Sequence, residues 1–166
     1  LALATEWDKT FEKSDKVDHQ KVTFKNRYGI TLAADLYHPK NVTGKIAALV
    51  ISGPFGAVKE QSSGRYAQTM AERGFITLAF DPSYTGESGG EPRDVASPDI
   101  NTEDFSAAVD FIGMLPSGAR VLDVGCAAGR DSAILQDAGF DVVGIDLSQN
   151  FLELAQERVS GVKFLR

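Results

Sequence analysis

The sequence predicts an α/β fold, a three-layer doubly wound architecture whose mostly parallel sheet carries an antiparallel hairpin at its N-terminal end. Apolar runs of strand length alternate with amphipathic segments of helix length. From residue 46 onward several of these runs are almost continuously apolar, which is typical of parallel strands buried on both faces. The glycine-bracketed turn 125–129 then joins one such run directly to a helical segment, as in a βα unit.

The first regular element that the sequence predicts is a hairpin. Residues 21–25 and 31–38 are rich in residues that favour strands, and the second run alternates apolar and polar positions. Gly29, in the short connection between them, can adopt a positive φ. This pattern predicts two antiparallel strands.

The elements expected next are strand 46–51, helix 60–73, strand 75–80, a long loop 81–98 and helix 102–115. Gly74 should end the first helix, and Thr102 should cap the second. The apolar positions expected to face the core are Tyr66, Ala67, Met70 and Ala71 in the first helix and Phe105, Val109 and Ile112 in the second. The same periodicity assigns Phe75, Phe80, Phe105 and Phe111 to the core.

The last third of the chain repeats the alternation of strand and helix. The expected elements are strand 120–124, helix 130–138, strand 141–147, helix 149–159 and strand 162–165. A chain of 166 residues is long enough for one well-packed core, so a single domain over residues 1–166 is expected.

Composition argues against several classes of partner. The formal net charge of −6 opposes non-specific binding to nucleic acid, so no nucleic-acid partner is expected. No apolar run approaches the length that crosses a bilayer, so no membrane association is expected either. Cys126 is the one cysteine, which excludes an internal disulfide. We expect a cytoplasmic protein that is a monomer or a weak homodimer.

Residues 5–115 resemble the N-terminal part of an α/β-hydrolase of the dienelactone-hydrolase-like group. The matching segments are Trp7-Asp8-Lys9-Thr10-Phe11, residues 22–29, Gly56-Ala57-Val58-Lys59-Glu60-Gln61 and residues 79–88. The resemblance implies that the loop 52–56 supplies part of an oxyanion hole. It also implies that the fifth strand should end in a nucleophile elbow of the pattern G-x-S-x-G or a cysteine variant.

From residue 118 onward the chain resembles a different family, the class I S-adenosylmethionine-dependent methyltransferases. Residues 121–129 match the first motif of that family, and residues 142–148 match its second strand. The resemblance implies that the methionine part of the cofactor lies against the turn 125–129 and that Asp146 accepts hydrogen bonds from the ribose hydroxyls. Ala127 stands where the motif usually has glycine.

The candidate cofactor-binding residues are therefore Asp123, Gly125, Cys126, Ala127, Gly129, Asp146 and Leu147. The alternative is that these are turn and strand-end residues with no ligand. Asp123 has two interpretations of equal weight, a hydrogen bond to the ligand's amino group or to N–H groups of the loop. No cofactor is required by the sequence, S-adenosylmethionine is the candidate, and no metal site is expected.

No catalytic residue is predicted. When the elbow pattern is aligned on Gly125 and Gly129, the nucleophile position falls on Ala127, which has no nucleophilic atom, and Cys126 lies one residue away. The two histidines, His19 and His38, lie at the N-terminal hairpin, whereas the resemblance places a triad histidine beyond the last strands.

Two families that meet inside one strand indicate an engineered or recombined chimera, with residues 1–117 from the hydrolase and 118–166 from the methyltransferase. Replacing the fifth hydrolase strand by the first methyltransferase strand gives the strand order 1-2-4-3-5-6-7, which exposes no inner strand as a new edge. The expected function is a chimeric fold with no complete active site. The alternatives are weak binding of S-adenosylmethionine or S-adenosylhomocysteine at the turn 125–129 and a residual esterase-type hydrolase.

Overall fold

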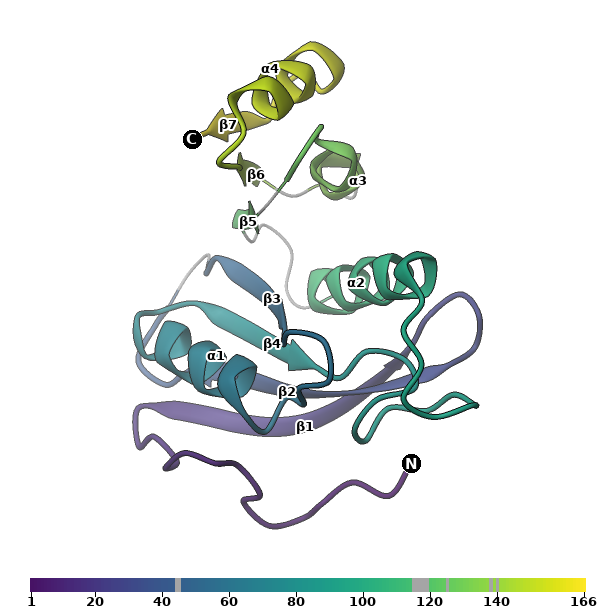
Figure 1. The fold of residues 1–166 in the computed structure, drawn as a ribbon. Helices are drawn as coiled ribbons and strands as arrows, with labels where there is room; N and C mark the ends of the chain where they lie inside the picture. The colour runs from purple at the N-terminus through teal and green to yellow at the C-terminus, as the bar shows by residue number, and fades with distance from the viewer. Residues whose placement is uncertain (44–45, 115–119, 125, 138, 140) are drawn as a thin grey trace. The chain divides into compact units, whose positions relative to one another are not determined.

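The computed structural model describes residues 1–43, 46–114, 120–124, 126–137, 139 and 141–166. Both parts of the chain in Figure 1 mix strands and helices, so the fold is α/β as predicted. The chain divides into two compact units, Leu1–Thr43 with Leu49–Ile112 and Gly44–Ala48 with Gly113–Arg166. This division lies close to the junction at 117/118 that the sequence indicates, and the expectation of one domain over the whole chain stays a prediction.

The sheet of the first unit begins with the hairpin. Strand β1 (Val17–Lys25) pairs antiparallel with β2 (Thr31–Pro39), and the pairing runs without a break from Val17 opposite Pro39 to Lys25 opposite Thr31. Strand β2 pairs antiparallel with β4 (Ile76–Phe80), which is followed in the sheet by β3 (Ala48–Ser52). Gly29 has a φ of +78° in the hairpin turn. The hairpin is therefore confirmed, with a first strand longer than expected.

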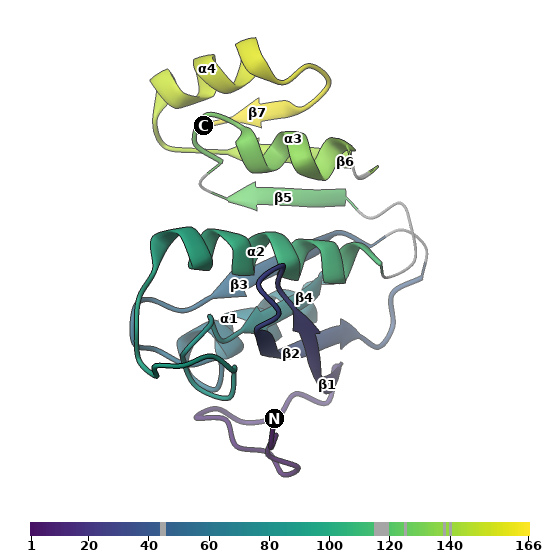
Figure 2. The same cartoon turned by 90° about the vertical axis from the view of Figure 1, so that its right-hand side faces the viewer.

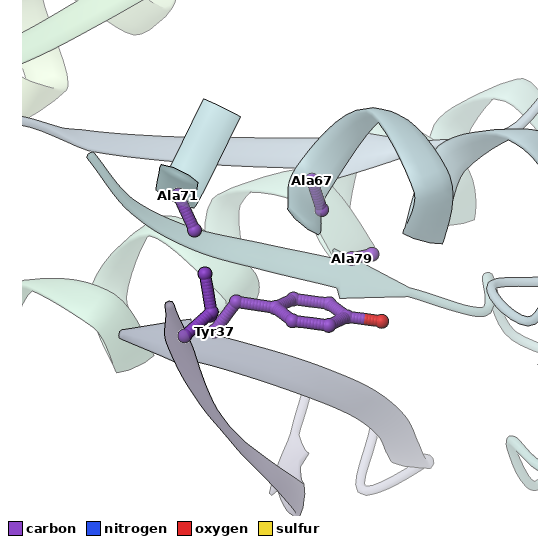
Figure 3. Close-up of a cluster of buried hydrophobic side chains, with 5 residues drawn as sticks. Tyr37, Ala67, Ala71 and Ala79 are labelled. Atoms are coloured by element: carbon purple, nitrogen blue, oxygen red, sulfur yellow. The ribbon is translucent and has the colours of Figure 1, made fainter. Parts of the chain in front are cut away.

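Two helices cover opposite faces of this sheet (Figures 1 and 2). Neighbouring residues of a strand point to opposite faces, so Ala79 and Phe80 of β4 face different helices. Ala79 packs with Tyr37 of β2 and with Ala67 and Ala71 of α1 (Ser62–Glu72), as Figure 3 shows. Phe80 packs edge to face with Phe105 of α2 (Pro98–Gly113), at a ring-centre distance of 4.9 Å.

The helix boundaries correct one expectation. Helix α2 begins at Pro98, and the hydroxyl of Thr102 donates to the carbonyl of Pro98 at 2.8 Å from inside the helix, so Thr102 is not the cap. Proline is favoured at the first helical position because its missing N–H has no partner to lose there. The carbonyl of Ser97 accepts the N–H of Asn101 at 2.8 Å, which places the start of the helix four residues earlier.

Two aromatic residues assigned to the core are partly exposed. Tyr66 of α1 is 56% exposed, because the buried face of this helix is made of small and polar residues, namely Ser63, Gly64, Ala67, Gln68 and Ala71. Phe105 is 41% exposed although one edge of its ring meets Phe80. Phe80 itself is buried as predicted.

A buried lysine fixes the loop that follows β4. The side chains of Lys59 and Asp81 are fully buried, and Nζ of Lys59 lies 2.9 Å from Oδ2 of Asp81 and 2.7 Å from Oε2 of Glu87. The N–H of Lys59 also donates to Oδ1 of Asp81 at 2.8 Å. Burial alone would lower the pKa of Lys59, but the charge of Asp81 and hydrogen bonds to Glu60, Glu87 and Asp81 outweigh it and raise the pKa.

Three parallel strands are described in the second unit. Strand β6 (Asp141–Ile145) pairs on one side with β5 (Arg120–Val124) and on the other with β7 (Lys163–Leu165). Helices α3 (Arg130–Asp137) and α4 (Gln149–Arg158) alternate with them in the chain, as predicted. One cluster of buried side chains among the described residues of this unit contains Cys126, Leu152, Ala155, Val159 and Phe164.

The sheet is mixed rather than mostly parallel. The pairs of β2 with β1 and with β4 are antiparallel, while the pairs of β6 are parallel. The sequence pattern indicates which runs are strands but not the direction in which they pair. The pair of β2 with β4 is antiparallel in addition to the hairpin pair of β1 with β2, so β2 is antiparallel to both of its neighbours. The order 1-2-4-3-5-6-7 across the two units stays a prediction. None of the helices in the described ranges is long and apolar enough to cross a membrane.

Replacing Lys59 by methionine should strongly destabilise the first unit. The change leaves the buried carboxylate of Asp81 without its counter-ion, and breaking one side of a buried pair costs about 3 to 5 kcal/mol. Chemical denaturation followed by fluorescence of Trp7 measures the loss. The control is Lys40→Met, which breaks an exposed pair with Asp18 at 3.8 Å and should cost less than about 1 kcal/mol. Equal losses in the two variants would contradict the role given to Lys59.

Replacing Gly144 by alanine should destabilise the second unit. A methyl group at this position would lie 2.6 Å from Cδ1 of Phe164 and 3.0 Å from Sγ of Cys126, closer than carbon atoms approach in a packed core. Overpacking of this kind costs about 1 to 3 kcal/mol. Denaturation followed by far-ultraviolet circular dichroism measures the change, and adding Phe164→Leu should recover part of it. A fully stable single variant would show that this contact is not close.

Candidate functional site

The site that the sequence predicts is the turn between β5 and α3. Gly129 has a φ of +78°, and its N–H donates to the carbonyl of Cys126 at 2.9 Å, which closes the turn. The carbonyl of Gly129 then accepts the N–H of Ala133 at 3.0 Å, the first hydrogen bond of the helix. Gly125, one of the predicted binding residues, lies outside the described residues.

Asp146 links this turn by hydrogen bonds to the turn between β6 and α4. It follows β6, and its Oδ2 accepts the N–H of Ala127 at 3.0 Å while its Oδ1 accepts the N–H of Ser148 at 2.7 Å. Ser148 in turn caps α4 by accepting the N–H of Phe151 at 3.4 Å. The two turns at the carboxyl ends of β5 and β6 are thus held together by one half-buried carboxylate.

Ala127 and Leu147 are the exposed members of the predicted site. Ala127 has a φ of +45°, a conformation that residues other than glycine rarely adopt. Leu147 is 89% exposed directly after Asp146. These two side chains and the carboxylate of Asp146 are therefore accessible to a ligand, and they come from two different βα turns.

Cys126 does not present its thiol to this site. The residue is 6% exposed, and its side chain packs in the core of the second unit. Burial, with smaller contributions from the charges of Asp123 and Asp146, raises the pKa of the thiol to about 11. The reactive thiolate form is therefore scarce at neutral pH.

The structure gives Gly129 and Asp123 definite packing roles. A methyl group on Gly129 would lie 3.0 Å from Cβ of Ala155 and 3.1 Å from Cζ of Phe164, so the absence of a side chain lets α4 and β7 approach the turn. Asp123 is half-buried, and its Oδ2 accepts the hydroxyl proton of Ser132 on α3 at 2.6 Å. Both residues hold the turn in place.

The acceptor capacity of Asp146 fits the ribose of an adenosine cofactor. A carboxylate offers about four lone-pair positions, and the two backbone N–H groups use one on each oxygen. The remaining positions can accept two hydroxyl groups. Among the predicted binding residues, Asp146 and the exposed Leu147 thus have side chains that a ligand can reach, while the side chain of Cys126 is buried.

On the hydrolase side the predicted oxyanion loop lies between β3 and α1. Gly56 has a φ of +79° in this loop, and Phe55 beside it is exposed. The histidines are engaged elsewhere, since Nε2 of His19 lies 2.7 Å from Oδ1 of Asp35 and Nδ1 of His38 lies 2.9 Å from the carbonyl of Pro39. Neither contact is part of a nucleophile–histidine pair.

Sequence reasoning missed a cluster of partly exposed charges in the first unit. Nζ of Lys21 lies 2.7 Å from Asp8, 2.6 Å from Glu87 and 3.4 Å from Glu60. The same three carboxylates lie within 4.8 Å of one another, the arrangement of a metal site, but the ammonium of Lys21 supplies the positive charge between them. Lys59, Glu60 and Glu87 belong to the hydrolase-like segments 56–61 and 79–88, so the sequence analysis had already singled out these residues. The resemblance indicated a family, but it did not indicate that their side chains form a charge network.

Comparisons with known proteins match the two parts of the chain to two families. A methyltransferase domain model matches residues 121–166, and the model of the X-Pro dipeptidyl-peptidase (S15 family) matches residues 28–118. The protein PA2218 of Pseudomonas aeruginosa is 80% identical over 121 residues, which are 72% of this chain and 33% of PA2218. YcjY of Escherichia coli is 42% identical over 135 residues, 76% of this chain and 44% of YcjY.

Solved structures agree on the fold. The crystal structure of PA2218 gives a TM-score of 0.73 at 64% identity, covering 87% of this chain and 47% of that chain. The α/β-hydrolase GrgF from Penicillium gives 0.58 at 20% identity, covering 77% of this chain and 45% of its own. This chain spans less than half the length of each of these relatives. The α/β-hydrolase likeness is confirmed, and the match over residues 28–118 shows that the chain belongs to the X-Pro dipeptidyl-peptidase (S15) family.

Proposed function

We propose that this chain is a chimera of an α/β-hydrolase and a methyltransferase, and that its described residues assemble no hydrolase centre. The two family models support the junction, since one ends at residue 118 and the other begins at 121, at the start of β5. In this proposal β5 takes the place of the hydrolase strand that carries the nucleophile, which gives the sheet order 1-2-4-3-5-6-7. Recombination or engineering would each produce such a chain.

The observation that carries this proposal is the conformation of Ala127. A nucleophile elbow holds its serine on a sharp, strained turn between a strand and a helix. The turn between β5 and α3 has this strand-turn-helix form. Ala127 occupies the position of the nucleophile in this turn, and it has a positive φ. The conformation expected of a nucleophile is present, but the side chain is a methyl group.

A residual esterase-type hydrolase is the competing proposal, and the described residues show no histidine paired with a nucleophile. His19 and His38 lie on the hairpin strands, where their side chains contact Asp35 and Pro39. The buried thiol of Cys126, with its raised pKa, is a poor nucleophile. Chromogenic ester substrates test this alternative directly, and hydrolysis above the uncatalysed rate would favour it.

A second function, binding of S-adenosylmethionine or S-adenosylhomocysteine, is favoured by Asp146. The methyltransferase model covers this residue, and its carboxylate has acceptor positions left beside two exposed side chains. The methionine end of the ligand would lie at the turn that contains Ala127. When bound, the cofactor would supply a methyl group for transfer. No methyl acceptor is assigned.

The first test replaces Ala127 by serine. The variant carries the pattern Gly-Cys-Ser-Ala-Gly on a strand-turn-helix, in a residue that already has a positive φ. Without a histidine to take the proton, the serine should remain unlabelled by an organophosphonate ester and should leave ester hydrolysis at the background rate. Mass spectrometry of the intact protein measures labelling. Stoichiometric modification at this position would reveal a base and would favour the hydrolase.

The second test uses S-adenosylhomocysteine and thermal unfolding. A ligand at ten times its dissociation constant stabilises the folded state by about 1.4 kcal/mol, and Asp146→Ala should abolish this gain because the ribose hydroxyls lose their acceptor. The control is Asp137→Ala, an exposed acid at the end of α3, which should keep the full ligand effect. Undiminished stabilisation in Asp146→Ala would place the ligand elsewhere.

A further inference from the structure

Three buried side-chain oxygens of the first unit have no hydrogen-bond partner among the described residues. They are the hydroxyl of Tyr37, the hydroxyl of Ser63 and Oδ2 of Asp35. Tyr37 is fully buried, and Ser63 is 4% exposed. A buried hydroxyl without a partner has lost its hydrogen bonds to bulk water, and this loss costs free energy. In folded proteins such groups are usually paired, often with an ordered water molecule.

The ring of Tyr37 runs along one row of side chains on α1. Ala71 and Ala67 lie four residues apart on the buried face of this helix, and Ser63 is the next residue of the row toward the N-terminus. The ring packs with both alanines, and Figure 3 shows its hydroxyl beyond Ala67, on the side away from Ala71. The hydroxyl of Tyr37 therefore points toward the first turn of α1, which contains Ser63.

The electrostatic surroundings of Tyr37 agree with this direction. Burial raises the pKa of its hydroxyl, and the charges of Asp35, Glu60 and Asp8 raise the pKa further. Glu60 directly precedes the residue that caps the N-terminus of α1. The hydroxyl of Tyr37 thus lies near the end of the helix that carries Ser63. Because the two hydroxyls do not bond to each other, a molecule placed between them would give both a partner.

We propose that one buried water molecule bridges Tyr37 and Ser63 and so connects β2 to the first turn of α1. The water accepts the proton of the Tyr37 hydroxyl and donates one of its own protons to Oγ of Ser63. Its second proton goes to Oδ2 of Asp35, two residues before Tyr37 on the same face of the sheet. This oxygen lies 3.0 Å from Nζ of Lys9 and can accept further, because a carboxylate offers about four lone-pair positions. The water then makes about three hydrogen bonds, as buried water typically does.

Water suits this place better than an ion does. A cation would lie close to the ammonium of Lys9, and an anion would lie close to the carboxylate of Asp35, so either would meet a like charge in a buried site. A neutral molecule that can both donate and accept avoids this repulsion.

The position of Ser63 gives the bridge a structural role. A methyl group on Gly53 would lie 3.5 Å from Oγ of Ser63, so this hydroxyl borders the loop 52–56 that follows β3. A water held between Tyr37 and Ser63 therefore fixes the start of α1 beside that loop.

Urea denaturation of the whole chain, followed by the fluorescence of Trp7, tests this inference. Tyr37→Phe and Ser63→Ala each remove one hydroxyl that binds the water, so each should lower the urea concentration at the unfolding midpoint. The double variant should lose less than the sum of the two single losses, because one water serves both hydroxyls. The matched controls are Tyr66→Phe and Ser62→Ala, which remove exposed hydroxyls from the same helix and correct for the change of residue type.

The opposite sign is expected if the hydroxyls have no partner in the folded protein. Removing an unpartnered buried hydroxyl relieves the cost of burying it, so the midpoint would then rise above that of the matched control. A midpoint of Tyr37→Phe or Ser63→Ala at or above its control would therefore overturn the inference. Single losses that add fully in the double variant would also overturn it, because they would show that the two hydroxyls share no water.

A high-resolution crystal structure of the unmodified chain gives a check that needs no variant. We expect the electron density of one water at about 2.7 to 2.8 Å from the hydroxyl oxygens of both Tyr37 and Ser63. Density that shows the two hydroxyls bonded directly to each other, or no water within reach of both, would overturn the proposal.

Discussion

The first unit depends on the burial of the ion pair between Lys59 and Asp81. One carboxylate receives the backbone N–H and the ammonium of Lys59, and it also accepts the N–H of Glu87 at 2.9 Å, so a single side chain fixes both the segment before α1 and the loop after β4. A methyl group on Gly86 would collide with the carboxylate, which explains the glycine there. Because removing ions from water is costly, this arrangement is stable only when every partner is present. Lys21 extends the same network to Asp8, in the irregular segment that precedes β1.

Periodicity was sufficient to predict the elements because each depends on local pattern. The strand Arg120–Val124 is present with the expected ends. The hairpin and the alternation of strands and helices in the second unit are also present, and the ends of several of these elements differ from the expected ones by one to a few residues. The start of α2 was misplaced because Pro98 and Thr102 are both acceptable N-terminal residues, and only the hydrogen bond from Asn101 to Ser97 distinguishes them. The mixed character of the sheet was underestimated because pairing direction is a property of two strands and not of either sequence.

The candidate site shows a similar limit. Sequence motifs predicted which residues surround the turn after β5, but not which of them are accessible. Cys126 and Gly129 belong to the motif and are buried, where they serve packing against Phe164 and α4. Asp146 and Leu147 belong to the match over the second strand, residues 142–148. The carboxylate of Asp146 bridges the two turns, and Leu147 is exposed. Side-chain packing in three dimensions separates these roles, and it depends on residues some twenty to forty positions away along the chain.

The distribution of aromatic residues has a consequence for spectroscopy. Trp7 and the four tyrosines, Tyr28, Tyr37, Tyr66 and Tyr84, all belong to the first unit, whereas the aromatic residues of the second unit are phenylalanines. Intrinsic fluorescence excited near 280 nm therefore originates in the first unit, with Trp7 as its main emitter. An unfolding transition followed in this way reports the hydrolase-like part of the chain alone. The methyltransferase-like part is optically silent there, and a tryptophan placed at the exposed Phe151 would give it a signal of its own.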